Sequence, residues 1–351
     1  DITVQSDFIY VAYDSSGGGQ GWLYILRQTL IPTLIEEGSL DTPGSASRID
    51  IDWPYVYMGD GISGLTICDV TDPTSPQQES TTPCISYGSD ISVNNGNVYM
   101  ILLDAGFEVF DPTDPSNPVS LSRYRTLNNA GDMIFKDDYL IVSDVTGYYN
   151  AVKTIDVSDP QNLQIDAELW PSMRPIRLDM SNDVMIAADN NEWMACDASD
   201  PLNLLPGGGD VASNAIRAIG ICWPILYISH DIPGSPEILL YNISNYTSPT
   251  PQGSFAVANR VTGFAFRYNY MYMSNSDGVL VYDVTDPVNP VYETTYFCTN
   301  PRDPEIRGYH LHILVEQSIE ILDISNPPAL VFKGSVTHPG LMPLESLCMD
   351  G

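Results

Sequence analysis

Short runs rich in β-branched and aromatic residues recur along the whole chain, separated by clusters of Gly, Asn, Asp and Pro. Runs of this length and composition predict β-strands, and the helical spacing of apolar residues is nearly absent. The runs come in groups of four, and one clear group is SRIDID (47–52), YVYMGD (55–60), GLTICDV (64–70) and QQESTTP (77–83). The hydrophobic pattern therefore predicts an all-β protein built from repeats of four short strands.

The third run of most repeats is apolar at both positions before its final acidic residue. Examples are Ile67-Cys68, Val109-Phe110, Val281-Tyr282 and Ile321-Leu322. Consecutive residues of a strand point to opposite faces, so adjacent apolar residues indicate that both faces of the sheet are covered. The pattern favours sheets that stack against a neighbour on each side over a meander with one solvated face.

A turn motif of the form D-x-[ST]-D-P follows the third run and sets the period of the repeat. The motif begins, at intervals of 40–45 residues, at Asp69, Asp111, Asp156, Asp197 and Asp283, and in looser form at Asn242 and Asp323. One period before Asp69 lies Arg27, in a stretch that keeps the apolar strand and lacks the acidic turn. This stretch makes an eighth repeat. A period of 40–45 residues is typical of propeller blades, so eight repeats predict eight blades.

The chemistry of this motif explains why the chain repeats it. The side chains of Asp and of Ser or Thr accept hydrogen bonds from backbone N–H groups two residues further on. The Pro fixes its own φ and cannot extend the strand ladder. We therefore interpret these aspartates as turn builders that end the third strand, and not as acid catalysts.

We expect one all-β propeller of four-stranded blades over residues 1–351, with eight blades preferred. The alternative is a seven-bladed ring in which the divergent N-terminal repeat is displaced. The last residues, 341–351, resemble another first strand. We expect them to form either a surplus strand or the strand that closes the ring, because closure removes the exposed edges of a sheet.

At this point the sequence resembles the LVIVD-repeat family of β-propellers. The resemblance is carried by an apolar strand followed by D-[VI]-[ST]-[DN]-P, in LTICDVTDP, VKTIDVSDP, VLVYDVTDP and IEILDISNP. It implies a secreted or surface-exposed propeller. It implies no catalytic residues, because the family has no shared catalytic set to carry over.

The charge of the chain limits its partners. Lys and Arg number 14 against 45 acidic residues, which gives a formal net charge of −31. Such a surface repels nucleic acid and anionic lipid, so cations, basic proteins or neutral glycans are the expected partners. No apolar run approaches the roughly 20 residues of a membrane helix, and we expect no membrane insertion. The composition, rich in Tyr, Asn and Ser and poor in Lys, favours an extracellular or cell-surface protein.

Cysteine and histidine offer little chemistry. Cys68 and Cys196 hold the same strand position three repeats apart, too far for the about 7 Å limit of a disulfide. We expect most of the six cysteines to be buried free thiols, with a Cys298–Cys348 pair left open. His312 aligns with apolar residues such as Val56, which predicts a packed histidine.

Acidic residues recur at the hairpin after the second strand, where a ring of carboxylates would attract a hard cation such as Ca²⁺. Solvated turn residues are the simpler interpretation. The calcium candidates are Asp60, Asp104, Asp144, Asp189 and Asp277, with Asp231 and Glu316 at the equivalent places of other repeats.

One segment, PRDPEIRGYHLH, departs from the other repeats and concentrates scarce basic residues. An enzyme would be expected to break its repeats at channel-facing positions with converging polar groups, and the candidate channel cluster is Arg302, Glu305, Arg307, Tyr309 and His310. Ordinary divergence of a terminal blade explains the same segment.

The sequence favours a non-catalytic scaffold for protein interaction or self-assembly, outside the cell or on its surface. We expect a protein or glycan partner to bind at the exposed loops. The chain could also assemble into a homo-oligomer or polymer. The alternatives are a secreted carbohydrate-active enzyme, a lyase or hydrolase with a central-channel site, and a calcium-dependent adhesin. No cofactor other than calcium is expected.

Overall fold

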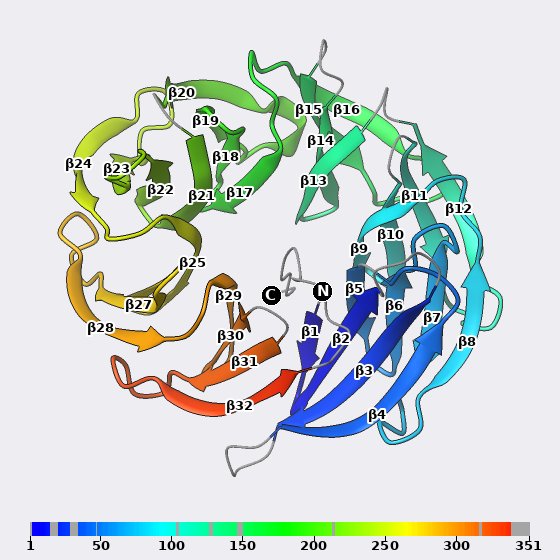
Figure 1. The fold of residues 1–351 in the computed structure, drawn as a ribbon. Helices are drawn as coiled ribbons and strands as arrows, with labels where there is room; N and C mark the ends of the chain where they lie inside the picture. Colours follow the sequence, from blue (N-terminus) through cyan, green and yellow to red (C-terminus); the bar gives the residue numbers. More distant parts are fainter. Residues whose placement is uncertain are drawn as a thin grey trace. The chain divides into compact units, whose positions relative to one another are not determined.

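Each repeat of the sequence folds into one four-stranded antiparallel sheet (Figure 1). The computed structural model describes residues 2–14, 20–28, 34–46, 48–102, 105–125, 129–145, 150–212, 215–315 and 318–337. In this part of the chain there are eight sheets and a single 3-10 turn, Pro201–Asn203. The fold is an all-β propeller of eight four-stranded blades, as predicted. The seven-bladed alternative is wrong, because the divergent first repeat forms a complete sheet of its own.

We number the sheets 1 to 8 in chain order. Sheets 1 to 4 consist of β1 (Ile2–Gln5), β2 (Phe8–Asp14), β3 (Gly21–Gln28) and β4 (Leu34–Thr42); β5 (Arg48–Asp52), β6 (Tyr55–Gly59), β7 (Leu65–Asp69) and β8 (Gln77–Thr82); β9 (Gly88–Asn94), β10 (Asn97–Leu102), β11 (Gly106–Asp111) and β12 (Val119–Tyr124); and β13 (Asn129–Lys136), β14 (Tyr139–Val145), β15 (Asn150–Asp156) and β16 (Gln164–Leu169).

Sheets 5 to 8 consist of β17 (Arg177–Ser181), β18 (Val184–Ala188), β19 (Glu192–Asp197) and β20 (Leu205–Val211); β21 (Ala215–Cys222), β22 (Ile225–Asp231), β23 (Glu237–Asn242) and β24 (Thr250–Ala256); β25 (Val261–Arg267), β26 (Tyr270–Asn275), β27 (Gly278–Asp283) and β28 (Val291–Phe297); and β29 (Pro301–Arg307), β30 (His310–Val315), β31 (Ser318–Asp323) and β32 (Val331–Thr337). The predicted strand runs coincide with these elements.

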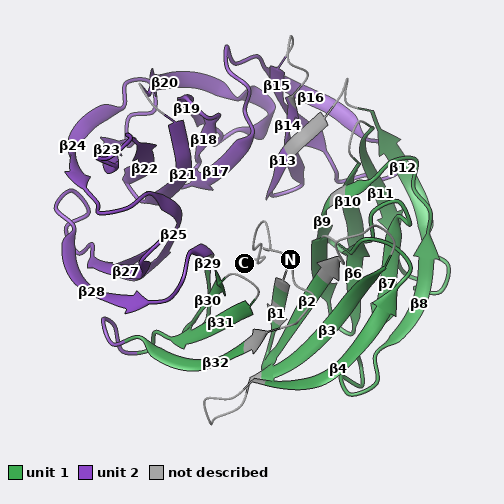
Figure 2. Cartoon of the chain, viewed as in Figure 1, with its two compact units in different colours: residues 1–129, 305–325, 330–351 green, residues 130–304, 326–329 purple. Residues whose placement is uncertain are grey.

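The chain divides into two compact units, coloured separately in Figure 2. Unit 1 comprises Asp1–Asn129, Glu305–Ser325 and Leu330–Gly351, and unit 2 comprises Ala130–Pro304 and Asn326–Ala329. Strands β1–β12 and β30–β32 therefore lie in unit 1 and β14–β28 in unit 2, while β13 and β29 cross the boundary.

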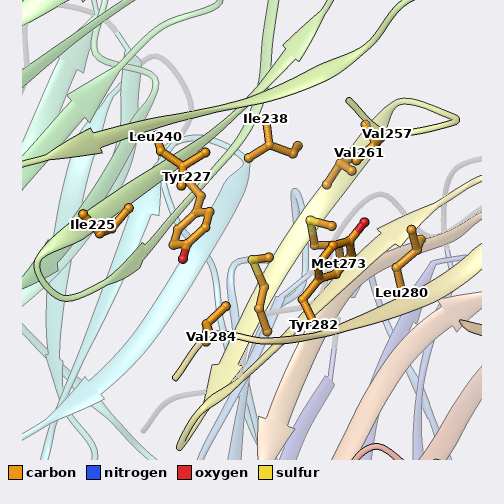
Figure 3. Close-up of a cluster of buried hydrophobic side chains, with 11 residues drawn as sticks. Ile225, Tyr227, Ile238, Leu240, Val257, Val261, Met273, Leu280, Tyr282 and Val284 are labelled. Carbon is orange, nitrogen blue, oxygen red and sulfur yellow. The ribbon is translucent and has the colours of Figure 1, made fainter. Parts of the chain in front are cut away.

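Within each unit, neighbouring sheets bury their faces against each other. Figure 3 shows one such layer in unit 2, where side chains of β22 and β23 meet those of β26 and β27. Tyr227 packs in this layer and donates a hydrogen bond from its hydroxyl to the Pro287 carbonyl oxygen at 2.6 Å. The third strands are buried on both faces, as the paired apolar positions predicted: Ile67 and Cys68 of β7 are both fully buried.

The first and last sheets of the chain are neighbours within unit 1. Ile9, Val11 and Leu26 of sheet 1 form a buried cluster with Leu314, Ile319 and Ile321 of sheet 8. The outer strands β4 and β32 also approach each other. The predicted role of residues 341–351 lies outside the described residues.

The turn motif has the predicted geometry in all seven repeats that carry it. In sheet 2, the Asp69 Oδ1 accepts a hydrogen bond from the Thr71 N–H at 2.7 Å, and the Asp72 Oδ1 accepts one from the Thr74 N–H at 3.0 Å. The first of these bonds recurs at Asp111, Asp156, Asp197, Asn242, Asp283 and Asp323.

The residue after this first Asp locks the turn onto the sheet. Val70 is buried and its N–H donates to the Pro54 carbonyl oxygen, in the hairpin between the first two strands, at 2.9 Å. The same bond joins Ile324 to Tyr309 at 2.8 Å in sheet 8. This packing explains why the motif reads D-[VAI]-[ST] in most repeats.

The prediction that most cysteines are buried free thiols holds only in part. Cys68, Cys84, Cys196 and Cys222 are free thiols, of which Cys68 and Cys196 are buried and the other two half-buried. Burial raises the pKa of Cys196 to about 12, so this thiol is not a nucleophile at neutral pH. The Cys298–Cys348 pair involves a residue outside the described ones.

The hairpin glycine Gly64 gives a test of the blade geometry. Its φ is +92°, and a Cβ there would lie 2.2 Å from the Thr82 carbonyl oxygen, whereas Gly96 has φ +74° and nothing within 4 Å. We expect Gly64→Ala to lower the free energy of unfolding by about 3 kcal/mol or more, and Gly96→Ala by about 1 kcal/mol. Urea unfolding of both variants measures this, and equal losses would contradict the steric account.

Candidate functional site

The antiparallel strands give every sheet two ends with different chemistry. In sheet 2, Tyr55 pairs with Asp69 at one end and Gly59 pairs with Leu65 at the other. We call the first the turn end, because it carries the hairpin between strands one and two and the D-x-[ST]-D-P turn. We call the second the hairpin end, because it carries the hairpin between strands two and three and the start of the first strand.

Asp60, a calcium candidate at the hairpin end of sheet 2, is fully buried. Its carboxylate accepts hydrogen bonds from the Thr42 Oγ1 at 2.9 Å, the Gly44 N–H at 3.0 Å and the Thr66 Oγ1 at 3.0 Å. Asp60 therefore ties the end of β4 and the segment that follows it to sheet 2.

The other candidates are held by different partners. Asp144 is buried and forms an ion pair with Lys153 Nζ at 2.8 Å. Asp189 accepts backbone N–H groups of its own hairpin, and the Asp277 Oδ2 accepts the Asn259 Nδ2 at 2.7 Å. Asp104, like Glu316, lies outside the described residues.

These carboxylates are thus individually engaged where the structure describes them. Across the described ranges, no group of three or more His, Cys, Asp or Glu side chains is arranged to hold a metal ion. Calcium binding stays a prediction, to be tested by the melting temperature in the presence of the ion.

The residues of the candidate channel cluster are spread along the hairpin of β29 and β30. Arg302 lies near the start of β29 at its hairpin end and belongs to unit 2. Glu305 and Arg307 follow on β29, Tyr309 lies in the turn after it, and His310 opens β30, all in unit 1. Burial lowers the pKa of His310, which favours its neutral form. A catalytic role for this cluster stays a prediction.

His312 is the packed histidine that the alignment with Val56 predicted. It is completely buried in β30, and burial lowers its pKa to about 3. The imidazole is therefore neutral at physiological pH and part of the core of unit 1.

A set of first-strand aspartates was missed by the sequence interpretation. Asp50 of β5 accepts the Val93 N–H of β9 at 2.5 Å, and Asp132 of β13 accepts the Leu178 N–H of β17 at 2.8 Å. Each bond joins the first strands of two neighbouring sheets. The sequence signal is an Asp within the first run of several repeats, as in SRIDID, GSDISV and IRLDMS.

Exposed aromatic side chains are the second feature that the sequence interpretation missed. Trp53, Trp223, Tyr268 and Tyr309 all lie in the turn between the first and second strands, at the turn end, and all are exposed. Only Tyr309 had been singled out. The repeated dipeptide Trp-Pro, at 53–54 and 223–224, was the available signal.

One of these rings lies against an arginine side chain of the same chain. The Arg267 guanidinium carbon lies 4.8 Å from the centroid of the Tyr268 ring, and Tyr268 is 73% exposed. This distance is within the range of a cation–π contact. The turn end of unit 2 thus presents an aromatic surface that binds guanidinium within its own chain.

Carboxylates also lie at the turn end. Hydrogen bonds from the side chain and backbone of Thr285 lower the pKa of Asp283, and the equivalent bonds from Thr113 lower the pKa of Asp111. Lowered pKa values keep these groups charged well into the acid range. The turn end is therefore anionic as well as aromatic.

Comparison with known proteins agrees with this fold. The family model described as LVIVD repeat matches residues 43–81 and 306–338, which confirms the resemblance carried by the turn motif. No curated protein matches the chain. None of the helical residues that the structure describes makes a segment long and apolar enough to cross a bilayer.

Solved structures share the fold at low sequence identity. The computationally designed protein Ika8 is 12% identical with a TM-score of 0.65, covering 88% of this chain and 91% of that one. Sqt1 of Saccharomyces cerevisiae is 10% identical with a TM-score of 0.65, covering 93% and 95%. AztD of Citrobacter koseri is 10% identical with a TM-score of 0.63, covering 95% of both chains. At these identities the likeness establishes the fold alone.

The triple acceptor Asp60 gives a test of the structural role of the hairpin carboxylates. We expect Asp60→Ala to lower the free energy of unfolding by about 3 kcal/mol or more, because it leaves buried donors unpaired. The control is Asp72→Ala, an exposed turn aspartate, for which we expect a much smaller loss. Chemical unfolding measures both, and similar losses would contradict the role assigned to Asp60.

Asp179, in the first strand of sheet 5, gives a pH test. Burial, with a smaller contribution from the charge of Asp132, raises its pKa to about 6. A raised folded-state pKa means that the ionised carboxylate destabilises the fold above pH 6 and that this penalty disappears toward pH 4. We therefore expect Asp179→Asn to raise the melting temperature at pH 8 and to have no effect at pH 4.

The matched control lies in the same sheet. Hydrogen bonds from Ser199 lower the pKa of Asp197, so its ionised form stabilises the fold at every pH above about 4. Asp197→Asn should therefore lower the melting temperature at pH 8. Melting curves between pH 4 and pH 8 in which Asp179→Asn is neutral or harmful throughout would contradict the assignment.

Proposed function

We propose that this protein is a non-catalytic binding scaffold, outside the cell or on its surface, whose turn end binds a partner surface rich in arginine and lysine. The observation that carries the proposal is the Arg267 guanidinium over the Tyr268 ring, 4.8 Å from its centroid. The same ring is 73% exposed, so much of its surface remains accessible to a partner.

Charge supports this choice of partner. The chain carries a net charge of −31, and the turn aspartates beside the aromatic residues have lowered pKa values. Acidic and aromatic groups together attract cationic side chains, through long-range steering and through cation–π contacts on arrival. Trp and Tyr are also the residues most enriched where protein interfaces hold their binding energy.

The hydrogen bonds and ion pairs of the buried and hairpin carboxylates support a non-catalytic role. Asp60, Asp144 and Asp189 each bind donors of the chain itself, as a structural group does. The fold and its LVIVD repeats are consistent with a scaffold that presents the same turn many times.

The test uses a labelled peptide of alternating Arg and Gly, with Lys-Gly and Glu-Gly peptides as comparisons. We expect binding in the order Arg, Lys, Glu by fluorescence anisotropy, and weaker binding at higher salt. Tyr268→Ala should weaken binding of the Arg peptide by about threefold or more, the equivalent of one exposed cation–π contact.

The matched control is Phe297→Ala, which removes a 79% exposed ring of the same unit at the hairpin end of sheet 7. This variant should bind the Arg peptide as the unmodified protein does. Equal effects of the two substitutions, or equal binding of the three peptides, would refute the proposal.

A further inference from the structure

Three arginines gather at the hairpin end of unit 2, opposite the aromatic turn end. Arg177 opens β17, Arg217 lies near the start of β21, and Arg260 directly precedes β25. These are the first strands of three consecutive sheets, and β21 packs against both β17 and β25. In a chain with only 14 basic residues, this grouping is not a general property of the surface.

Hydrogen bonds of the neighbouring residues fix the backbone positions of these arginines. The Ile176 N–H donates to the Ala188 carbonyl oxygen at 3.0 Å, and the Ile216 N–H donates to the Asn190 carbonyl oxygen at 2.6 Å. Arg177 and Arg217 therefore both follow residues bonded to the segment 188–190. Arg260 is placed by its neighbour Val261, whose carbonyl oxygen accepts the Ser229 Oγ at 2.8 Å.

One carboxylate oxygen orients two of the guanidinium groups. The Asp231 Oδ2 accepts the Arg217 Nε at 3.2 Å and the Arg260 Nη1 at 3.1 Å. Burial opposes ionisation of Asp231, yet these two arginines lower its pKa. The side chains of Arg217 and Arg260 are 44% and 51% exposed. Each has five N–H donors, so most of them face away from Asp231.

Arg177 completes the group and lacks an acceptor. Its Nη1 is buried and has no hydrogen-bond partner among the residues that the structure describes. Burial and the charge of Arg217 lower its pKa. Buried donors are nearly always paired in folded proteins, so an unpaired guanidinium nitrogen beside a second guanidinium indicates an acceptor that the described part of the chain does not supply.

The nearby acids accept hydrogen bonds from backbone N–H groups. The Asp132 carboxylate accepts the backbone N–H groups of Met133 and Leu178, and the Asp189 carboxylate accepts those of Asn191 and Glu192. The charges of both acids reach Arg177, but none of these four hydrogen bonds is donated by an arginine of the group.

We propose that Arg177, Arg217 and Arg260, oriented by Asp231, form a binding site for a small oxyanion, a carboxylate or a phosphate. Guanidinium groups bind both through paired, charge-assisted hydrogen bonds. The net charge of −31 repels a long polyanion, whereas a ligand with one or two charges meets mainly the local arginines. The site is independent of the proposed function at the turn end.

The test is calorimetric titration of the whole protein with succinate, with inorganic phosphate and with poly-L-glutamate, at low ionic strength. We expect saturable binding of succinate, phosphate or both, and the comparison identifies which class the site takes. Arg177→Gln and Arg217→Gln should each weaken that binding about tenfold, as expected for the loss of a charge-assisted pair.

The matched control is Arg27→Gln, which makes the same charge change at a 47% exposed arginine paired with Glu37 in unit 1. It should leave binding unchanged. Arg260→Gln provides a second variant if Arg177→Gln fails to fold, as judged by circular dichroism. No saturable binding of either small anion, equal weakening in all the variants, or tighter binding of poly-L-glutamate would overturn the proposal.

Discussion

The structure depends on packing of the apolar third strands between neighbouring sheets. Adjacent apolar residues such as Ile67 and Cys68 are both fully buried, so each sheet needs a neighbour on both sides. A sheet with a neighbour on only one side would expose one of these faces, and each large side chain left in water would lose roughly 2 kcal/mol of burial free energy. The repeats therefore stabilise one another, and the D-x-[ST]-D-P turn serves this packing by ending the third strand at the same place each time.

Acidic residues build much of the fold, which changes how the charge of −31 is understood. In the turns they accept backbone N–H groups, in the first strands they join neighbouring sheets through bonds such as Asp50 to Val93, and at Asp60 one carboxylate ties two sheets together. These roles need an acceptor with several lone pairs, which a carboxylate supplies. The few arginines are then informative by their position, because three of them lie at the same end of three consecutive sheets.

The fold could be predicted from the sequence because its information is local and repeated. Strand composition, the paired apolar positions and the turn motif all act within a few residues, and the period of 40–45 residues supplied the architecture. The buried state of His312 followed from the same alignment with Val56. The candidate sites were harder, because a recurring Asp looks the same whether it is solvated, like Asp72, or buried, like Asp60.

The arginine site arises from contacts between repeats. Arg217 and Arg260 share Asp231 although 43 residues separate them in the chain, and no local pattern encodes that meeting. The exposure of Tyr268 likewise depends on the end of the sheet at which its turn lies. The residues of the arginine site occupy similar positions in different repeats and share no motif within a repeat.

Hydrogen–deuterium exchange resolved by peptide mass spectrometry tests the central claim most directly. If both faces of every third strand are buried between sheets, β7, β11, β15, β19, β23 and β27 should exchange slowest, and the outer strands β8, β12, β16, β20, β24 and β28 markedly faster. Third strands that exchange as fast as the outer strands of the same sheets would contradict the account.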